Sequence, residues 1–420
     1  FPNHLTPSPL LHTTLYVTPW SSRTPSQLPR NRRYRLLRSS IINGYAMREL
    51  SVMGFALAAG VGILLWRDPI PKPDPILAPP DEAVVLARQA LSLAVSSAWR
   101  WCDLGETLAR ANELELAHYC FRRAVDLAPH ISAILARAAN FHIGFGDIPI
   151  ALEYTARILQ ESSEYDELIF QYCDLLVPDA HRILSYIQAN PRALRSYLLH
   201  VMKRNRAGDA VTVWQSINER GQATDELAAA FIEFLIQAGR YYQAAEIWAA
   251  YMGVRSGDYP NRNLIFNGGF EMEPSGCPLD WTIRPLDGVT VERDTRVVRE
   301  GHVSLKIRFL GTANLHYSHV TQKVWVPHRR LRLTAWIRTE ELTTDEGFRL
   351  RVVDINQRRL LAQTEPVRGT NDWQRIEVTF MPPPRTGLLA VEICRLPSRR
   401  FDSKISGTAW LDGVRLELVQ

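Results

Sequence analysis

The sequence predicts a multidomain protein of the α plus all-β class, with a transmembrane helix near its N-terminus. Residues 50–66 form a run of 17 residues without a charged side chain. From residue 81 to residue 258, apolar residues recur at the helical spacing of 3.6 residues, and after residue 260 they alternate at the period of two that is typical of strands. A chain of 420 residues is long enough for such parts to form separate domains.

Residues 1–46 are predicted to be a disordered, basic leader. Six of the 49 basic residues lie there, and no Asp, Glu or Lys does. Met47 is followed by a short charged segment and the apolar run, so we expect residues 1–46 to lie upstream of the true start. A disordered basic tail or an organelle transit peptide is the alternative. The other 43 basic residues nearly balance 44 acidic ones, so no nucleic-acid partner is expected.

Residues 47–66 are predicted to form an uncleaved signal anchor. As a helix, Leu50 to Trp66 would be about 25 Å long, at the short end of what spans a bilayer. A cleaved signal peptide and a buried core helix are the alternatives. Because basic residues precede the run, we expect a single pass through a bacterial inner membrane with the body on the periplasmic side. Six prolines in residues 67–80 predict a semi-rigid spacer of ~40 Å.

Residues 81–258 contain helix pairs with small residues where two helices would touch. The best-defined pair carries Trp101, Leu104, Gly105, Leu108, Ala117, Phe121, Ala124 and Pro129. This spacing resembles the 34-residue tetratricopeptide repeat, with Leu108 in place of the usual aromatic residue. Ala151 and the pair Ala210 and Ala244 mark weaker copies. The resemblance implies an α-solenoid of four or five helical hairpins, with an irregular insert at 165–190.

Such an array implies a concave surface that binds a protein or peptide partner. The tryptophans at repeat positions, Trp101, Trp214 and Trp248, are expected in the core. The histidines of this region share no common spacing and are expected at the surface or in turns: His118, His130, His142, His181 and His200.

Residues 260–420 are predicted to form a β-sandwich of about ten short strands, because alternating apolar segments are separated by Gly, Pro and Asp. The segments NLIFNGGFE (263–271), LRLTAWIRTE (331–340) and AWLDGVRLEL (409–418) come in the order of jelly-roll carbohydrate-binding modules of the galactose-binding-like class. This resemblance covers 262–420. It implies glycan binding and a structural calcium ion held by Glu271 and Asp412. The alternative is that each carboxylate caps a turn.

Strand alternation places aromatic and arginine side chains together on one predicted sheet face. The glycan-binding candidates are Tyr317, Trp325, Trp336, Arg338 and Arg349. Aromatic rings stack on sugars, and the arginines would suit an acidic polysaccharide. The alternative is that this face packs against the helical array and its aromatic residues are interdomain core.

The five cysteines form no CxxC pair and are expected to be buried apolar side chains. Pairing of Cys102 with Cys120, or of Cys277 with Cys394, is the alternative in an exported protein. The sequence contains no HExxH, GxSxG, GxxxxGK[ST] or GxGxxG motif. We therefore expect a membrane-anchored, non-catalytic scaffold for exopolysaccharide assembly or export. A purely protein-binding structural factor and a glycan-processing enzyme are the alternatives.

Overall fold

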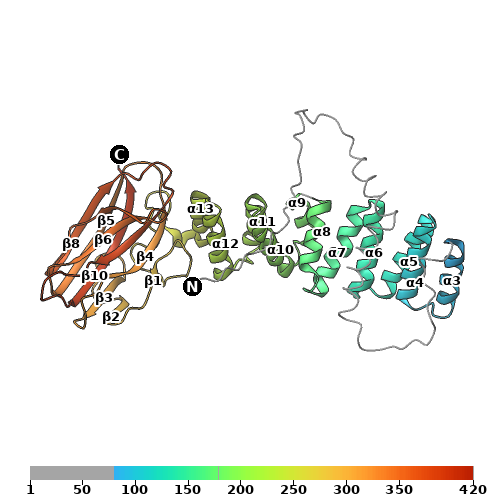
Figure 1. Cartoon of the computed structure of the whole chain (residues 1–420), viewed down its shortest axis with the longest axis horizontal. Coiled ribbons are helices and arrows are strands. Elements are labelled where there is room, and N and C mark those ends of the chain that lie inside the picture. Colours follow the sequence, from blue (N-terminus) through green and yellow to red (C-terminus); the bar gives the residue numbers. More distant parts are fainter. Residues whose placement is uncertain (1–79, 178, 420) are drawn as a thin grey trace, which may run out of the picture. The chain divides into compact units, whose positions relative to one another are not determined.

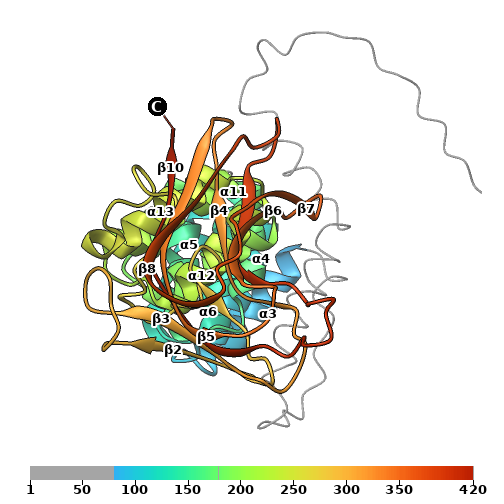
Figure 2. The same cartoon turned by 90° about the vertical axis from the view of Figure 1, so that its left-hand side faces the viewer.

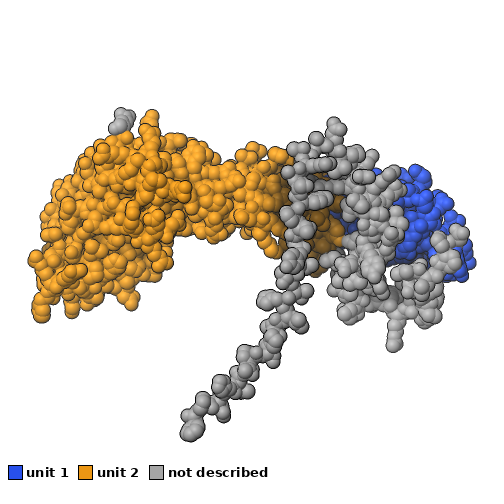
Figure 3. Space-filling view, turned by 45° about the horizontal axis from the view of Figure 1, so that its top comes forward, with its two compact units in different colours: residues 1–161 blue, residues 162–420 orange. Residues whose placement is uncertain are grey.

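The computed structural model describes residues 80–177 and 179–419. The chain divides into two compact units, residues 1–161 and residues 162–420 (Figure 3). The leader at 1–46, the anchor at 47–66 and all of the spacer but Pro80 lie outside the described residues. Within the described ranges, no helix is both long enough and apolar enough to cross a membrane.

The expected succession of helices followed by a β-sandwich is confirmed (Figure 1). The first unit contains α3 (Pro80–Ser92), α4 (Ala98–Arg110), α5 (Leu114–Leu127), α6 (Ser132–Phe145) and α7 (Ile148–Glu161). The helices of the second unit are α8 (Asp166–Leu176), α9 (Ala180–Ile187), α10 (Pro191–Lys203), α11 (Ala207–Glu219), α12 (Asp225–Gln237), α13 (Tyr241–Met252) and the short 3₁₀ helix η1 (Gly253–Ser256).

The helices pack as antiparallel hairpins, and α4 with α5 shows why. Gly105 lies where the two helices touch, and a Cβ atom there would come within 3.0 Å of Cε2 of Phe121. Ser97 begins α4 by accepting a hydrogen bond from the Arg100 amide. The chain then turns at Asn112, whose φ of 64° is left-handed. Small side chains at the contact therefore allow the close approach of the two backbones.

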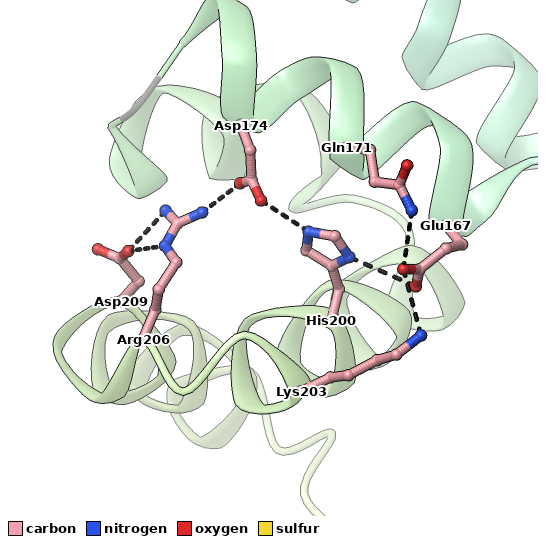
Figure 4. A network of polar contacts seen from close by, with 7 residues as sticks. All are labelled: Glu167, Gln171, Asp174, His200, Lys203, Arg206 and Asp209. Carbon is pink, nitrogen blue, oxygen red and sulfur yellow. Dashed lines mark hydrogen bonds and ion pairs between the residues drawn. The ribbon is translucent and has the colours of Figure 1, made fainter. Parts of the chain in front are cut away.

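A network of charged side chains joins α8 to α10 and α11 (Figure 4). The His200 ring lies between two carboxylates, with Nε2 2.8 Å from Oδ2 of Asp174 and Nδ1 3.5 Å from Oε2 of Glu167. Arg206 donates hydrogen bonds to Asp174 and to Asp209. His200 is buried, so its expected surface position is wrong. The network satisfies polar groups that helix packing would otherwise bury without partners.

The sandwich consists of two antiparallel sheets of five strands each. We call the first the helix-side sheet; its order is β1 (Thr282–Ile283), β4 (Tyr317–Trp325), β9 (Leu388–Arg395), β6 (Phe348–Asp354) and β7 (Arg359–Gln363). We call the second the outer sheet; its order is β2 (Val289–Asp294), β3 (Ser304–Leu310), β10 (Ser406–Leu418), β5 (Leu331–Leu342) and β8 (Gly369–Phe380).

The predicted alternation fills the space between the sheets. On β5, Leu333, Ala335 and Ile337 are buried in one apolar cluster with the inward residues of β3, β4, β6, β9 and β10. Trp336 and Arg338 alternate with them and therefore point to the opposite side of the outer sheet.

Strand β4 packs against α13 and forms the junction between helices and sandwich. The Tyr242 and Trp325 ring centroids lie 4.6 Å apart, and Nζ of Lys323 lies 3.4 Å from Oε2 of Glu233 on α12. Gln322 holds the incoming chain, since its side-chain amide accepts from the Phe266 N–H and donates to the Phe266 carbonyl. In Figure 1, β4 lies near α12 and α13, whereas β8 lies on the far side of the sandwich. In Figure 2 the sandwich lies in front of these helices.

All five cysteines are buried and free, as their interpretation as apolar side chains requires. The alternative pairings of Cys102 with Cys120 and of Cys277 with Cys394 are therefore not formed. Burial raises the pKa of the Cys102 thiol to about 12 and that of Cys120 to about 11. These thiols are protonated at neutral pH.

Candidate functional site

The candidate site lies on the outward surface of the outer sheet, which we call the outer face. A shallow depression of about 180 Å³ lies there between β5, β8 and β10. Its polar and aromatic lining consists of Thr334, Trp336, Arg375, Arg415 and Glu417. Gly413 completes it with a left-handed φ of 57°. A Cβ atom at Gly413 would come 3.2 Å from Cδ1 of Trp336, so the glycine lets the indole lie close to the sheet.

The indole of Trp336 is covered on one side by an arginine from the loop before β3. The guanidinium carbon of Arg299 lies 4.3 Å from the ring centroid. Asp412 fixes this loop, because its Oδ2 accepts hydrogen bonds from the Arg299 and Glu300 amides, both at 2.9 Å. The guanidinium therefore lies over one face of the indole and can donate hydrogen bonds from its edge.

A second arginine and indole lie beside the first pair. The guanidinium carbon of Arg338 is 5.9 Å from the Trp410 ring centroid. Trp410 itself is buried, and its Nε1 donates to Oδ2 of Asp294 at 2.9 Å. Its ring therefore supports the outer face from below and leaves Arg338 at the surface.

Carboxylates accompany the arginines of the outer face. Arg375 lies 3.5 Å from Glu377, Arg338 lies 3.7 Å from Asp372, and Arg415 lies 3.9 Å from Glu300 and 3.7 Å from Glu417. These separations are longer than a direct hydrogen bond, and exposed pairs of this kind contribute little to stability. The outer face therefore offers donors and acceptors side by side, and its charge is balanced.

The structure divides the predicted glycan-binding residues between two sheets. Tyr317 and Trp325 lie on β4 and Arg349 on β6, in the helix-side sheet, whereas Trp336 and Arg338 lie on β5 in the outer sheet. The expectation that they share one sheet face is wrong. Alternation along a strand distinguishes its two sides but does not determine which sheet the strand joins.

The predicted residues of the helix-side sheet are covered by other parts of the chain. Tyr317 is fully buried, because the register of β4 against β9 shifts between Tyr317 and Val320 and turns its ring into the core. Trp325 packs against Tyr242, as the interdomain alternative expected. Arg349 is buried and paired with Glu346. Trp336 and Arg338 are thus the two predicted residues that lie on the outer face.

The two predicted calcium ligands lie close together. A Cβ atom at Gly269 would be 3.7 Å from both Asp412 Oδ1 and Glu271 Cγ. Glu271 Oε1 accepts from the His302 amide at 2.8 Å, and Asp412 accepts from the Arg299, Glu300 and Gly413 amides. Burial raises the pKa of the Asp412 carboxyl, against the effect of these amides.

These contacts fit the capping alternative better than a calcium site. Both lone pairs of Asp412 Oδ2 are engaged by amides, so the two side chains offer few of the six to eight oxygen ligands that Ca²⁺ takes. Calcium binding at Glu271 and Asp412 stays a prediction.

Comparison with solved structures gives likenesses of the β-sandwich to carbohydrate-binding modules. One is TmCBM61 in complex with β-1,4-galactotriose, with 17% identity and a TM-score of 0.28 over 38% of this chain and 100% of that one. Another is the CBM22-1 xylan-binding domain from Paenibacillus barcinonensis Xyn10C, with 15% identity and a TM-score of 0.24 over 33% and 86%. At these identities the likeness concerns the fold alone.

No protein-family model matches the sequence. Among curated proteins, the tRNA nuclease WapA of Bacillus subtilis is 28% identical over 162 residues, which is 37% of this chain. The chain spans 7% of the length of that nuclease.

Sequence reasoning missed Arg299, Arg375, Arg415 and Glu417. Arg299 lies in a loop, where no periodic pattern predicts side-chain direction. Arg375 alternates with the buried Ile376 on β8, and this signal would have placed it outward. Arg415 and Glu417 follow a register shift between Asp412 and Arg415 on β10, which strand alternation does not reveal.

Proposed function

We propose that the protein is a non-catalytic scaffold whose β-sandwich, a jelly roll, binds a glycan on the outer face. The observation that carries the proposal is the Arg299 and Trp336 pair beside a depression lined with two arginines and a glutamate. A pyranose ring presents an apolar face that packs against such aromatic groups. Its hydroxyl groups both donate and accept hydrogen bonds, as the neighbouring guanidinium and carboxylate groups require.

The balanced charge of the outer face favours a neutral glycan over the acidic polysaccharide that the sequence suggested. Around the depression, Arg338, Arg375 and Arg415 each have a carboxylate within 4 Å. An anionic chain would meet these carboxylates as like charges. Neutral hydroxyl groups meet no such repulsion. They can form hydrogen bonds to these side chains in place of the weak surface ion pairs.

We further propose that the helices form a tetratricopeptide-like array for a protein or peptide partner, and that the chain is anchored in a bacterial inner membrane. The anchor proposal rests on the apolar run at residues 50–66. Exopolysaccharide assembly or export is the setting that such a combination suits. Fractionation of cells expressing the protein tests the anchor: recovery in the soluble cytoplasmic fraction would refute it.

Binding of the purified protein to a panel of neutral and acidic polysaccharides tests the glycan proposal. We expect a neutral polysaccharide to bind, and Trp336→Ala and Arg375→Ala each to weaken binding by tenfold or more. Trp99→Ala is the matched control, because this exposed indole lies on α4 and not on the sandwich. Absence of binding to every polysaccharide, or equal binding by Trp336→Ala, would refute the proposal. Turnover of the bound polysaccharide would favour the enzyme alternative.

One observation favours the purely protein-binding alternative. Large apolar side chains are exposed at the start of the helical region: Leu93, Val95, Trp99, Leu116 and Tyr119. Where such groups adjoin one another, they mark a protein interaction surface. If Trp99→Ala and Leu116→Ala abolish activity in cells while Trp336→Ala does not, this alternative replaces the glycan proposal.

A further inference from the structure

Two histidines and an aspartate from successive elements of the first unit converge at one point. His118 lies on α5, His142 lies in the last turn of α6, and Asp147 lies directly before α7. Gly146 ends α6 with a left-handed φ of 85°. The Asp147 amide then donates to the His142 carbonyl at 2.9 Å, so the turn folds Asp147 back over the end of α6.

The three side chains have the separations of a metal-ligand set. Oδ2 of Asp147 lies 3.4 Å from Nδ1 of His142 and 3.8 Å from Nε2 of His118. All three ligand atoms lie within 4.8 Å of one another, and no other group of three His, Cys, Asp or Glu side chains in the described residues does so. Tetrahedral zinc, with ligands at about 2.1 Å, requires ligand atoms roughly 3.4 Å apart. Small side-chain rotations would meet this requirement.

Aromatic neighbours hold the two imidazole rings in place. The Phe141 ring packs edge-on against both, with centroid distances of 4.7 Å to His118 and 5.2 Å to His142. Tyr154 lies 5.7 Å from His142. His142 is buried, whereas the side chains of His118 and Asp147 remain about one third and two fifths exposed. Solvent therefore reaches the open side of the group.

We propose that His118, His142 and Asp147 bind a divalent zinc ion, with water at the open position. Two imidazoles and one carboxylate suit zinc, whereas calcium and magnesium prefer oxygen ligands alone. The ion joins α5, α6 and the turn before α7, and so stabilises two neighbouring hairpins against separation. The competing interpretation is that Asp147 serves only as a hydrogen-bond partner of His142.

Titration of the whole chelator-treated protein with zinc chloride tests the proposal, with calorimetry and thermal unfolding as readouts. We expect a site at micromolar or lower zinc and a rise in Tm. His118→Ala and Asp147→Asn each weaken binding at least tenfold and abolish the rise. His130→Ala is the control, because His130 pairs with Glu161 at 2.7 Å outside the group and its loss leaves zinc binding unchanged.

Cobalt(II) absorption provides a second measurement that does not depend on stability. We expect the visible bands of four-coordinate cobalt in the unaltered protein and in His130→Ala, and their loss in His118→Ala. His118 is partly exposed, so this variant retains its fold, which circular dichroism checks. Absence of zinc binding at micromolar concentration, or binding that His118→Ala and Asp147→Asn leave unchanged, would overturn the proposal.

Discussion

The Tyr242 and Trp325 rings lie 4.6 Å apart and join the last long helix of the second unit to strand β4 of its sandwich. This contact decides how Trp325 is used, since a ring that packs on α13 is not available to stack on a sugar. It also leaves the outer face, on the other sheet, as the sandwich surface that these helices do not cover.

Trp325→Ala should loosen the junction between helices and sandwich. Full truncation of a core Trp costs about 3–5 kcal/mol; for this partly buried ring we expect a loss of about 2 kcal/mol in the free energy of unfolding. The double variant with Tyr242→Ala should show a coupling energy of about 1 kcal/mol between the rings. Urea unfolding measures both. Phe401→Ala, a fully exposed ring in the same unit, is the control and should change stability by less than about 0.5 kcal/mol.

Alanine substitution at two helical glycines of the first unit should change the free energy of unfolding in opposite directions. At Gly105 the new methyl group would lie 3.0 Å from the Phe121 ring, and overpacking should cost about 1–3 kcal/mol. At Gly144 on α6 nothing lies within 4 Å, so the higher helix propensity of alanine should add about 1 kcal/mol. Thermal unfolding of Gly105→Ala and Gly144→Ala measures the difference. Equal shifts in Tm would contradict the close contact between α4 and α5.

The sequence predicted those features of the fold that depend on periodicity. Alternation located the strand with Leu333, Ala335 and Ile337, and small residues located the contact at Gly105. The same reasoning failed for Tyr317, because a register shift of one strand against its neighbour reverses which side a residue faces. It also failed for His118 and His142, which lie 24 residues apart and meet only when α5 packs against α6. Spacing along the chain predicts contacts within an element, and tertiary packing decides the others.

Asp412→Ala should destabilise the sandwich whether or not calcium is bound. The substitution removes the acceptor of the Arg299, Glu300 and Gly413 amides, and we expect a loss of about 3 kcal/mol. Asp402→Ala, at an exposed loop position, is the control. The calcium prediction has its own measurement: if Glu271 and Asp412 hold calcium, adding calcium chloride to the chelator-treated His118→Ala variant, which lacks the proposed zinc site, raises its Tm. Capping alone leaves that Tm unchanged.

Glu167 on α8 should make the stability of the helical region depend on acid pH. Hydrogen bonds from Gln171, and then from Lys203 and His200, lower the pKa of this carboxyl from its usual 4.5 to about 2 (Figure 4). The folded state therefore favours the ionised carboxylate, and above pH 4.5 Glu167 is ionised in the folded and the unfolded protein alike. Its contribution to the free energy of unfolding is fully present above pH 4.5 and is lost as the pH falls towards 2. Because the carboxylate is nearly half exposed, solvent screening should limit the effect to about 1 kcal/mol or less.

Glu167→Gln removes this titration while keeping the shape of the side chain. We expect the variant to be less stable than the unaltered protein at neutral pH. The difference should narrow as the pH falls through the window between 4.5 and about 2, because the protonated glutamate then resembles the amide. Urea midpoints measured in steps from neutral pH downward follow the difference, with Glu164→Gln, at an exposed position before α8, as the control. A difference that stays constant or widens towards acid would show that Glu167 contributes through packing, because packing does not titrate.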